Sequence, residues 1–330
     1  MRVRVGTYNV LHGLPVLGAP DESDLEGARA GVATTDEPRP HRPSDGRAGP
    51  PVVADDGPLR AAVAALDADV LGLQEIDSGQ PRSGHHHQVR SAAEAMGADH
   101  WYFAPSVRGT PGEVRDRWER PDAEDERRAN QASANHRNRE PSDRVRDVVS
   151  QGSSDGIPPG GGPLYGVGLV SRLPVLEWRT TLFDPAPFAL PLLVHAHPRP
   201  RLMLIPDEPR AAIAAVVSGT RGVFTVATVH LSFVPGYNVH QLRQLRTWLC
   251  DLPRPLVVLG DLNLPGSLPA RVTGWAPLAH GATYPASRPR VQLDHVLADG
   301  LSTAEVAGAR SQVHQLPVSD HCAVTVEVEL

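Results

Sequence analysis

The sequence predicts a mixed α/β fold in which strands outnumber helices. Short apolar runs recur along the 330 residues, and many begin or end at a single polar side chain. Runs of that length are typical of buried strands. Helical periodicity is limited to a few segments, and we expect helices over residues 58–66, 89–96 and 240–249. Because polar residues that suit one reaction come from both ends of the chain, we expect a single domain over residues 1–330.

The composition allows a large core and disfavours several functions. Hydrophobic residues make up 40% of the chain and aromatic residues only 5%, so the core must consist mainly of Val, Leu and Ala. The net charge of −6 disfavours unspecific binding of long nucleic acid, which requires many cations. Two cysteines give no disulfide framework. No stretch is typical of a signal peptide or a membrane span. We therefore expect a cytoplasmic protein without membrane insertion, and we predict no protein partner.

Two stretches have a composition that disfavours ordered structure. Residues 14–57 are rich in Pro, Gly and Asp, and we expect an irregular loop there. Residues 106–163 combine many charged side chains with few aliphatic ones, so they bury too little apolar surface to offset chain entropy. We expect a disordered insertion, with at most a short helix near residues 115–128. A third stretch, residues 184–209, is interrupted by prolines and is typical of edge hairpins.

Six of the expected strands carry a polar residue at or near one end. Carboxylate and amide oxygens are the ligands that Mg²⁺ prefers, and an imidazole can transfer protons near neutral pH. The set therefore suits metal-assisted attack on a phosphate ester, although no single strand end is specific by itself. The polar residues at these positions are Asn9, Glu75, His230, Asp261, Asn263, Asp294, Asp320 and His321.

The motifs around these residues occur in a defined order along the chain. They are Thr7-Tyr8-Asn9, Leu73-Gln74-Glu75, Gly166-Val167-Gly168-Leu169-Val170-Ser171-Arg172, Thr228-Val229-His230-Leu231, Gly260-Asp261-Leu262-Asn263, Leu293-Asp294-His295 and Ser319-Asp320-His321. In this order they resemble the endonuclease/exonuclease/phosphatase superfamily, in particular bacterial members that keep a histidine in the middle strand. The resemblance covers residues 7–321. It implies a DNase I-like α/β fold, a four-layer sandwich of two packed mixed β-sheets flanked by helices.

The resemblance implies a metal site formed by three of these residues. Glu75 and Asp320 would be ligands, and Asn9 would support the metal or an oxygen bound to it. The expected ion is Mg²⁺, with Mn²⁺ as an alternative. From the residues alone, a carboxylate that follows four apolar strand residues is costly to bury without a cation, which favours the same role for Glu75.

The resemblance also implies roles in catalysis. Asp261 would orient or deprotonate the attacking water, and Asn263 would bind the phosphate. These two lie two residues apart, so on an extended segment they point the same way. Asp294 would hold His321 in one tautomer, and His321 would contact the scissile phosphate or activate water. His230 would donate a hydrogen bond to the phosphate or a proton to the leaving oxygen.

Three further residues are weaker candidates for substrate binding. Arg82 and Ser83 follow Glu75 closely and would lie at the rim of the site, but an ordinary surface loop explains them equally well. Asn238 begins a helix after His230, where it would either bind an anion or face water.

We therefore expect a Mg²⁺-dependent phosphodiesterase of nuclease-like type that acts on a phosphate ester. The net acidity leaves open a lipid substrate, as in sphingomyelinases, or an inositol phosphate. The alternative of another class is a non-catalytic binding module on the same scaffold. Such a module would lack a ligand or a histidine of the set, and the motifs retain all of them.

Overall fold

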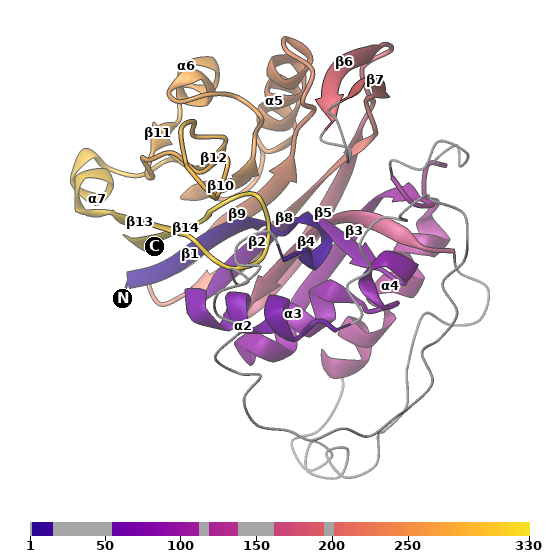
Figure 1. Ribbon diagram of the computed structural model, residues 1–330. Helices are drawn as coiled ribbons and strands as arrows, with labels where there is room; N and C mark the ends of the chain where they lie inside the picture. The colour runs from indigo at the N-terminus through magenta and orange to yellow at the C-terminus, as the bar shows by residue number, and fades with distance from the viewer. Residues whose placement is uncertain (1, 16–54, 112–118, 138–161, 195–200) are drawn as a thin grey trace, which may run out of the picture.

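The computed structural model describes residues 2–15, 55–111, 119–137, 162–194 and 201–330 (Figure 1). It contains two six-stranded sheets that pack face to face. In sheet order, the first consists of β13 (Arg310–His314), β14 (Ala323–Glu329), β1 (Arg2–Asn9), β2 (Val70–Ser78), β4 (Leu164–Ser171) and β3 (His100–Arg108). The second consists of β11 (Ala276–Pro277), β12 (Asp294–Asp299), β10 (Leu256–Asp261), β9 (Gly222–His230), β8 (Arg210–Gly219) and β5 (Val175–Phe183). Strands β6 (Ala189–Val194) and β7 (Arg201–Pro206) form a separate hairpin, as predicted for residues 184–209.

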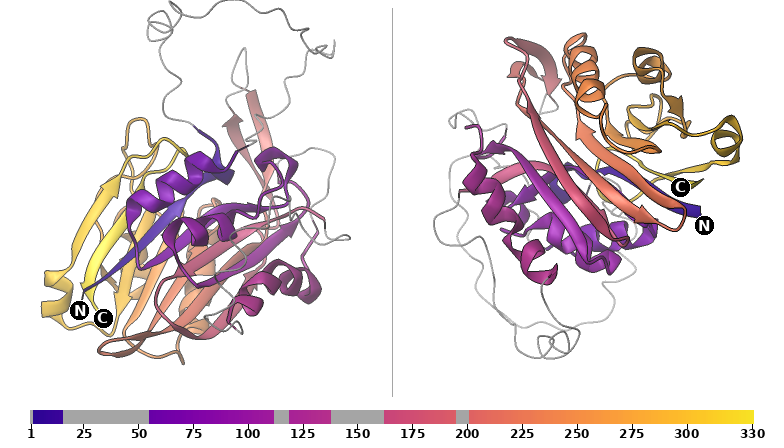
Figure 2. Two further views of the ribbon diagram at one scale, coloured as in Figure 1. Left: turned by 90° about the horizontal axis from the view of Figure 1, so that it is seen from below. Right: turned by 180° about the vertical axis from the view of Figure 1, so that it is seen from behind.

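Helices cover the outer faces of both sheets, which completes the predicted four-layer sandwich (Figures 1 and 2). Against the first sheet lie α2 (Gly57–Leu66), α3 (Gln88–Met96) and α4 (Ala123–Arg137), and against the second lie α5 (Tyr237–Trp248) and α6 (Leu268–Thr273). The shorter elements are α7 (Thr303–Gly308) and the 3₁₀ turns η1 (Leu11–Gly13) and η2 (Pro81–Ser83). Helices α2, α3 and α5 are those predicted from periodicity, although α5 begins earlier than expected.

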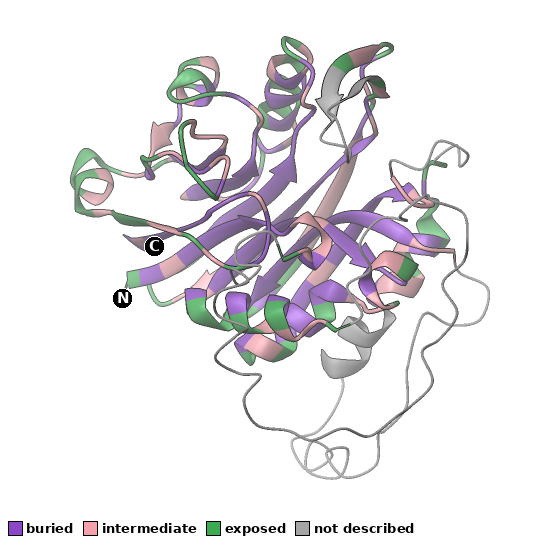
Figure 3. Cartoon of the chain, in the orientation of Figure 1, coloured by how far each residue is buried: buried purple, intermediate pink, exposed green. Residues whose placement is uncertain are grey.

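The main core lies between the two sheets. Val5 of β1 and Val257 of β10 are completely buried there. Because side chains alternate along a strand, neighbouring residues pack against the helices instead, as Tyr8 and Val258 do. Figure 3 shows the central strands of both sheets buried over most of their length, whereas the edge strands β5 and β13 are mostly intermediate or exposed and the helices combine buried and exposed residues. None of the described helices has the length and apolarity to cross a membrane.

The expectation of disorder over residues 106–163 is wrong for part of that stretch. Strand β3 continues through Arg108, and residues 123–137 form α4. This helix is held by polar contacts, which hydrophobic periodicity does not reveal. Its Asn130 donates to the carbonyl oxygen of Phe103 and accepts from the N–H of the same residue, both at 2.8 Å. Asp125 pairs with Arg108 (Nε–Oδ2 3.0 Å). Residues 112–118 and 138–161, like 16–54 of the predicted loop 14–57, lie outside the described residues.

Glycine at position 260 allows β10 to pair with β9 immediately before Asp261. Its φ is +151°, and a Cβ there would lie 2.0 Å from the carbonyl oxygen of Val229. A backbone atom cannot move away alone, so we expect Gly260→Ala to lower the free energy of unfolding by about 3 kcal/mol, measured by urea denaturation. Gly308→Ala is the matched control, because nothing lies within 4 Å of the added methyl group. Equal stability of the two variants would contradict this account.

Candidate active site

Side-chain alternation brings polar residues from both sheets to the same inner region. In β1, Val3 and Val5 face the second sheet, and Asn9 lies on the same face at the strand end. In the second sheet, Asp261 is the direct register partner of His230 on one side and of Asp294 on the other. Each of these three continues the inner, core-facing positions of its own strand. The site is therefore the polar end of the apolar core.

A β-bulge determines the placement of Glu75. The register between β2 and β4 shifts between Leu73 and Ile76, and Glu75 has a φ of +54°. A bulge changes the direction of a side chain, and such strained backbone is common at functional sites. Just before the bulge, Gln74 accepts from Thr7 (3.1 Å) and donates to Thr228 (2.9 Å). This buried hydrogen-bond chain ties the two sheets together beneath the site.

Asn9 links two carboxylates that come from different sheets. Its Nδ2 donates to Oε1 of Glu75 (3.0 Å) and to Oδ2 of Asp261 (3.1 Å). Its Oδ1 accepts from the N–H of Leu11 (3.2 Å), so the amide nitrogen, and not the oxygen, faces the carboxylates. In this arrangement Asn9 positions Glu75 and Asp261, and direct ligation of a metal by Asn9 stays a prediction.

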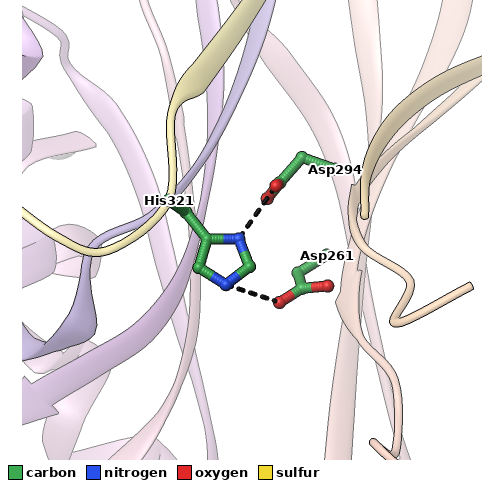
Figure 4. A group of neighbouring side chains, drawn as sticks. All are labelled: Asp261, Asp294 and His321. Atoms are coloured by element: carbon green, nitrogen blue, oxygen red, sulfur yellow. Dashed lines mark hydrogen bonds and ion pairs between the residues drawn. The ribbon is translucent and has the colours of Figure 1, made fainter. Parts of the chain in front are cut away.

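His321 and Asp294 form the pair that the motifs predict, and Asp261 lies beside them (Figure 4). His321 Nδ1 is 2.9 Å from Asp294 Oδ2, and Nε2 is 3.7 Å from Asp261 Oδ2. Burial opposes the imidazolium, but Asp294 and Asp261 outweigh that effect and raise the pKa of His321 to about 10. Burial also raises the pKa of Asp261, against the opposing charge of His321. At neutral pH His321 is therefore a cation, and Asp261 is the better candidate for a base.

His230 lies on the other side of Asp261. Its Nε2 is 3.6 Å from Asp261 Oδ2 and 3.2 Å from Asn263 Nδ2, while its Nδ1 is 3.2 Å from Nη1 of Arg210. Burial, the charge of Arg210 and the charge of His321 hold the pKa of His230 well below its ordinary value. The two histidines of the site therefore differ in charge: His321 is protonated and His230 is neutral.

Asn263 lies in the tight turn that follows β10. It has a φ of +49°, its N–H donates to Asp261 Oδ1 (3.0 Å), and its Nδ2 donates to the carbonyl oxygen of Leu231 (3.0 Å). Asn238, at the start of α5, is buried and donates to the carbonyl oxygen of Asn263 (2.8 Å). The geometry thus makes Asn238 a support for the turn that carries Asn263, and a contact of Asn238 with substrate stays a prediction.

The two rim candidates make contacts within the protein. Arg82 donates twice to Asp77, from Nε (2.9 Å) and from Nη2 (2.8 Å), and its guanidinium lies 5.5 Å from the ring centroid of Tyr165. Ser83 is buried and donates to the carbonyl oxygen of Gln80 (3.3 Å). These contacts account for both residues as supports of the loop after Glu75, and their binding of substrate stays untested.

Sequence reasoning missed a buried ionic group beside His230. It consists of Asp207, Glu208 and Arg210, which precede or begin β8. Their position within a proline-rich stretch favours an exposed hairpin, so the sequence does not indicate that they are buried beside the site. The available signal is three charged residues close together immediately before an Ala-rich strand. Tyr284 also adjoins the site, because its ring centroid lies 4.8 Å from that of the His321 imidazole.

The donor set fits a divalent cation. Burial raises the pKa of Glu75 to about 7, and the nearby charge of Asp320 contributes to the shift. The Asn9 hydrogen bond and the charge of His321 act against this shift, but neither outweighs the effect of burial. One oxygen of the buried Asp294 lacks a hydrogen-bond partner among the described residues. Asp261, Asp294 and His321 bring one possible ligand atom each within 4.8 Å of one another. Because His321 Nδ1 is engaged by Asp294, we interpret that cluster as acid–base machinery.

Comparison with known proteins identifies the family. Residues 6–321 match the Endonuclease/Exonuclease/phosphatase family, so the chain belongs to it. An endonuclease/exonuclease/phosphatase from Beutenbergia cavernae DSM 12333 is 18% identical over 100% of this chain and 72% of that chain, with a TM-score of 0.52. Sphingomyelinase C from Streptomyces griseocarneus is 14% identical over 100% of both chains, with a TM-score of 0.50. A comparison with curated proteins found no match.

These comparisons confirm the predicted family and the predicted fold. Membership places the chain among hydrolases that act on phosphate esters. The structural likeness, at these low identities, shows the DNase I-like sandwich and nothing about the substrate.

Proposed function

We propose that this protein is a Mg²⁺-dependent phosphodiesterase of nuclease-like type. The observation that carries the proposal is the convergence of Glu75, Asp261 and the His321–Asp294 pair, which come from both sheets and both ends of the chain. Mn²⁺ is the alternative ion. The cytoplasmic location expected from the sequence is a prediction that the proposed activity leaves open.

The proposed mechanism assigns a separate task to each group. Asp261 accepts a proton from the attacking water, because burial raises the pKa of its carboxyl toward neutrality. His321 presents a positive charge to the phosphate oxygens, and Asp294 keeps its ring in place. Mg²⁺ would be held by Glu75 and Asp320, with Asn9 orienting Glu75, and it supplies Lewis-acid polarisation of a phosphate oxygen when bound.

The test is a hydrolysis panel on the purified protein with Mg²⁺, with EDTA, and with EDTA followed by excess Mg²⁺. Suitable substrates are a chromogenic diester, supercoiled plasmid, abasic DNA, sphingomyelin and phosphoinositides. We expect turnover of a diester that EDTA abolishes and Mg²⁺ restores, and an Asp261→Asn protein purified in parallel controls for contaminants. Turnover that is insensitive to EDTA, or a failure to hydrolyse any of these substrates, would contradict the proposal. Preferred cleavage of sphingomyelin or phosphoinositide over plasmid would assign a lipid substrate instead.

A further inference from the structure

Arg210 is a buried cation that contacts His230 on the side remote from Asp261. Its side chain is 4% exposed. Nη1 lies 3.2 Å from His230 Nδ1 and 3.2 Å from Oε1 of Glu208, and Nη2 lies 3.3 Å from Oδ1 of Asp207. Asp207 is itself held by the hydroxyl of Ser232, which donates at 2.7 Å. The guanidinium is therefore fixed in place by two acidic residues, and one of its edges is directed at the imidazole.

The contact between Arg210 and His230 restricts the protonation of the imidazole. A guanidinium has N–H donors and no acceptor, and it stays charged at every pH that the protein tolerates. A hydrogen bond at 3.2 Å therefore requires an unprotonated Nδ1 on His230. An imidazolium carries protons on both nitrogens, so it would direct one of them at a cation. The geometry thus selects a neutral ring whose single proton is on Nε2.

The surroundings of Nε2 are compatible with that tautomer. Asp261 Oδ2 lies 3.6 Å from Nε2, beyond hydrogen-bond distance, and its charge favours a proton on that nitrogen, whereas Asn263 Nδ2, at 3.2 Å, is a second donor. An imidazole can accept from only one of the two donors that face it. We expect Arg210 to prevail, because a charged donor is stronger than an amide, and because Asn263 already donates to Leu231. The Nε atom of Arg210 has no partner among the described residues. Loss of the His230 contact would leave Nη1 with Glu208 as its one remaining partner among the described residues.

We propose that Arg210 is a positioning residue that holds His230 as a neutral imidazole with its proton on Nε2, so that His230 is a hydrogen-bond donor to the substrate and not a general acid or base. The ionisable groups that face His230 are Arg210 from β8, Asp261 from β10 and His321 from the segment before β14. The assignment of a substrate role to His230 depends on the proposed phosphoesterase function. The assignment of the tautomer does not depend on that function.

The tautomer can be measured without an activity assay. Two-dimensional ¹⁵N–¹H NMR of the ring nitrogens, with the His230 signals identified by their loss in His230→Gln, should show a proton on Nε2 and a bare Nδ1 throughout about pH 5–8. Arg210→Lys keeps a charged donor and should leave the pattern unchanged. Arg210→Met should allow His230 to titrate or to exchange tautomers. A proton on Nδ1, or an imidazolium near neutral pH in the unmodified protein, would overturn the proposal.

Kinetics provide a second and independent readout. Glutamine presents an N–H close to the position of Nε2 but cannot exchange a proton. We expect His230→Gln to keep at least about tenfold more activity than His230→Ala, because a hydrogen bond to a charged group is worth roughly ten- to a hundredfold. Equal loss in the two variants would show that proton transfer is essential and would refute the donor role. If Arg210→Met does not fold, Arg210→Lys and the two His230 variants still test the proposed role of His230. If the protein hydrolyses no phosphate ester, the NMR result stands alone and only the proposed function fails.

Discussion

Replacing His321 with Ala should lower the turnover of a phosphodiester at least about 100-fold, the lower end of the range for removing one group that stabilises transition-state charge. The imidazole is held by Asp294 at 2.9 Å, and the carboxylates of Asp294 and Asp261 keep it charged at neutral pH. Its removal would eliminate the positive charge that we assign to the phosphate oxygens. Steady-state kinetics at saturating Mg²⁺ would show the loss mainly in kcat, because the charge matters most in the transition state.

Two comparisons make this prediction specific. Asp294→Asn should also reduce turnover, and the double variant should be little worse than His321→Ala alone, because residues that act as a unit are not additive. His240→Ala is the matched control, since His240 is exposed on α5 and belongs to no part of the proposed machinery. Near-normal turnover by His321→Ala would show that the His321–Asp294 pair has no role in the mechanism.

Replacing Glu75 with Gln should abolish most Mg²⁺-dependent activity while preserving the fold. The glutamine side-chain oxygen can still accept from Asn9, so the bulge in β2 has no reason to change. Only the charge is lost. Lewis-acid catalysis is worth several kcal/mol and about 1.4 kcal/mol corresponds to a tenfold rate, so we expect a loss of at least about 100-fold at moderate Mg²⁺. Glu119→Gln, at an exposed position, is the control and should behave as the unmodified protein.

The raised pKa of Glu75 also predicts how the free energy of unfolding of the unmodified protein depends on pH. Burial raises the pKa of Glu75 from 4.5 to about 7, so between these values the folded state binds more protons than the unfolded state. The free energy of unfolding without metal should therefore fall as the pH rises through this window and stay low above it. The raised pKa of Asp261 acts in the same direction.

Mg²⁺ should offset the cost of burying the charged form of Glu75 and raise the melting temperature more above pH 7 than below pH 4.5, outside the two limits of that window. In Glu75→Gln the effect of Mg²⁺ should shrink, and the metal-free variant should exceed the metal-free parent in stability above pH 7. Thermal unfolding with and without Mg²⁺ measures both quantities. A Mg²⁺ shift that does not depend on pH would contradict ligation by Glu75.

Strands with runs of Val and Leu could be predicted from the sequence, whereas elements without a clear hydrophobic pattern could not. Strands such as β10 consist mainly of Val and Leu, and their burial follows from composition. Four of the ten residues of strand β8 are alanine, a residue depleted in strands, and its pairing with β9 and β5 makes it a strand. Helix α4 (Ala123–Arg137) was predicted only as a short helix near residues 115–128, because Asn130 and Asp125 anchor it through hydrogen bonds and not through an apolar face.

The ordered motifs, through their resemblance to a known family, indicated the family and the sandwich from sequence alone, and the polar residues at strand ends indicated the residue types of the candidate site. These residues lie together because period-two alternation makes a polar residue at a strand end continue the core-facing side of its strand. Only the tertiary structure decided how those groups pair. That Arg210 approaches one nitrogen of His230, and that Asn9 joins Glu75 to Asp261, depends on sheet register and on the packing of one sheet against the other. These relations involve residues distant along the chain, and local sequence patterns do not encode them.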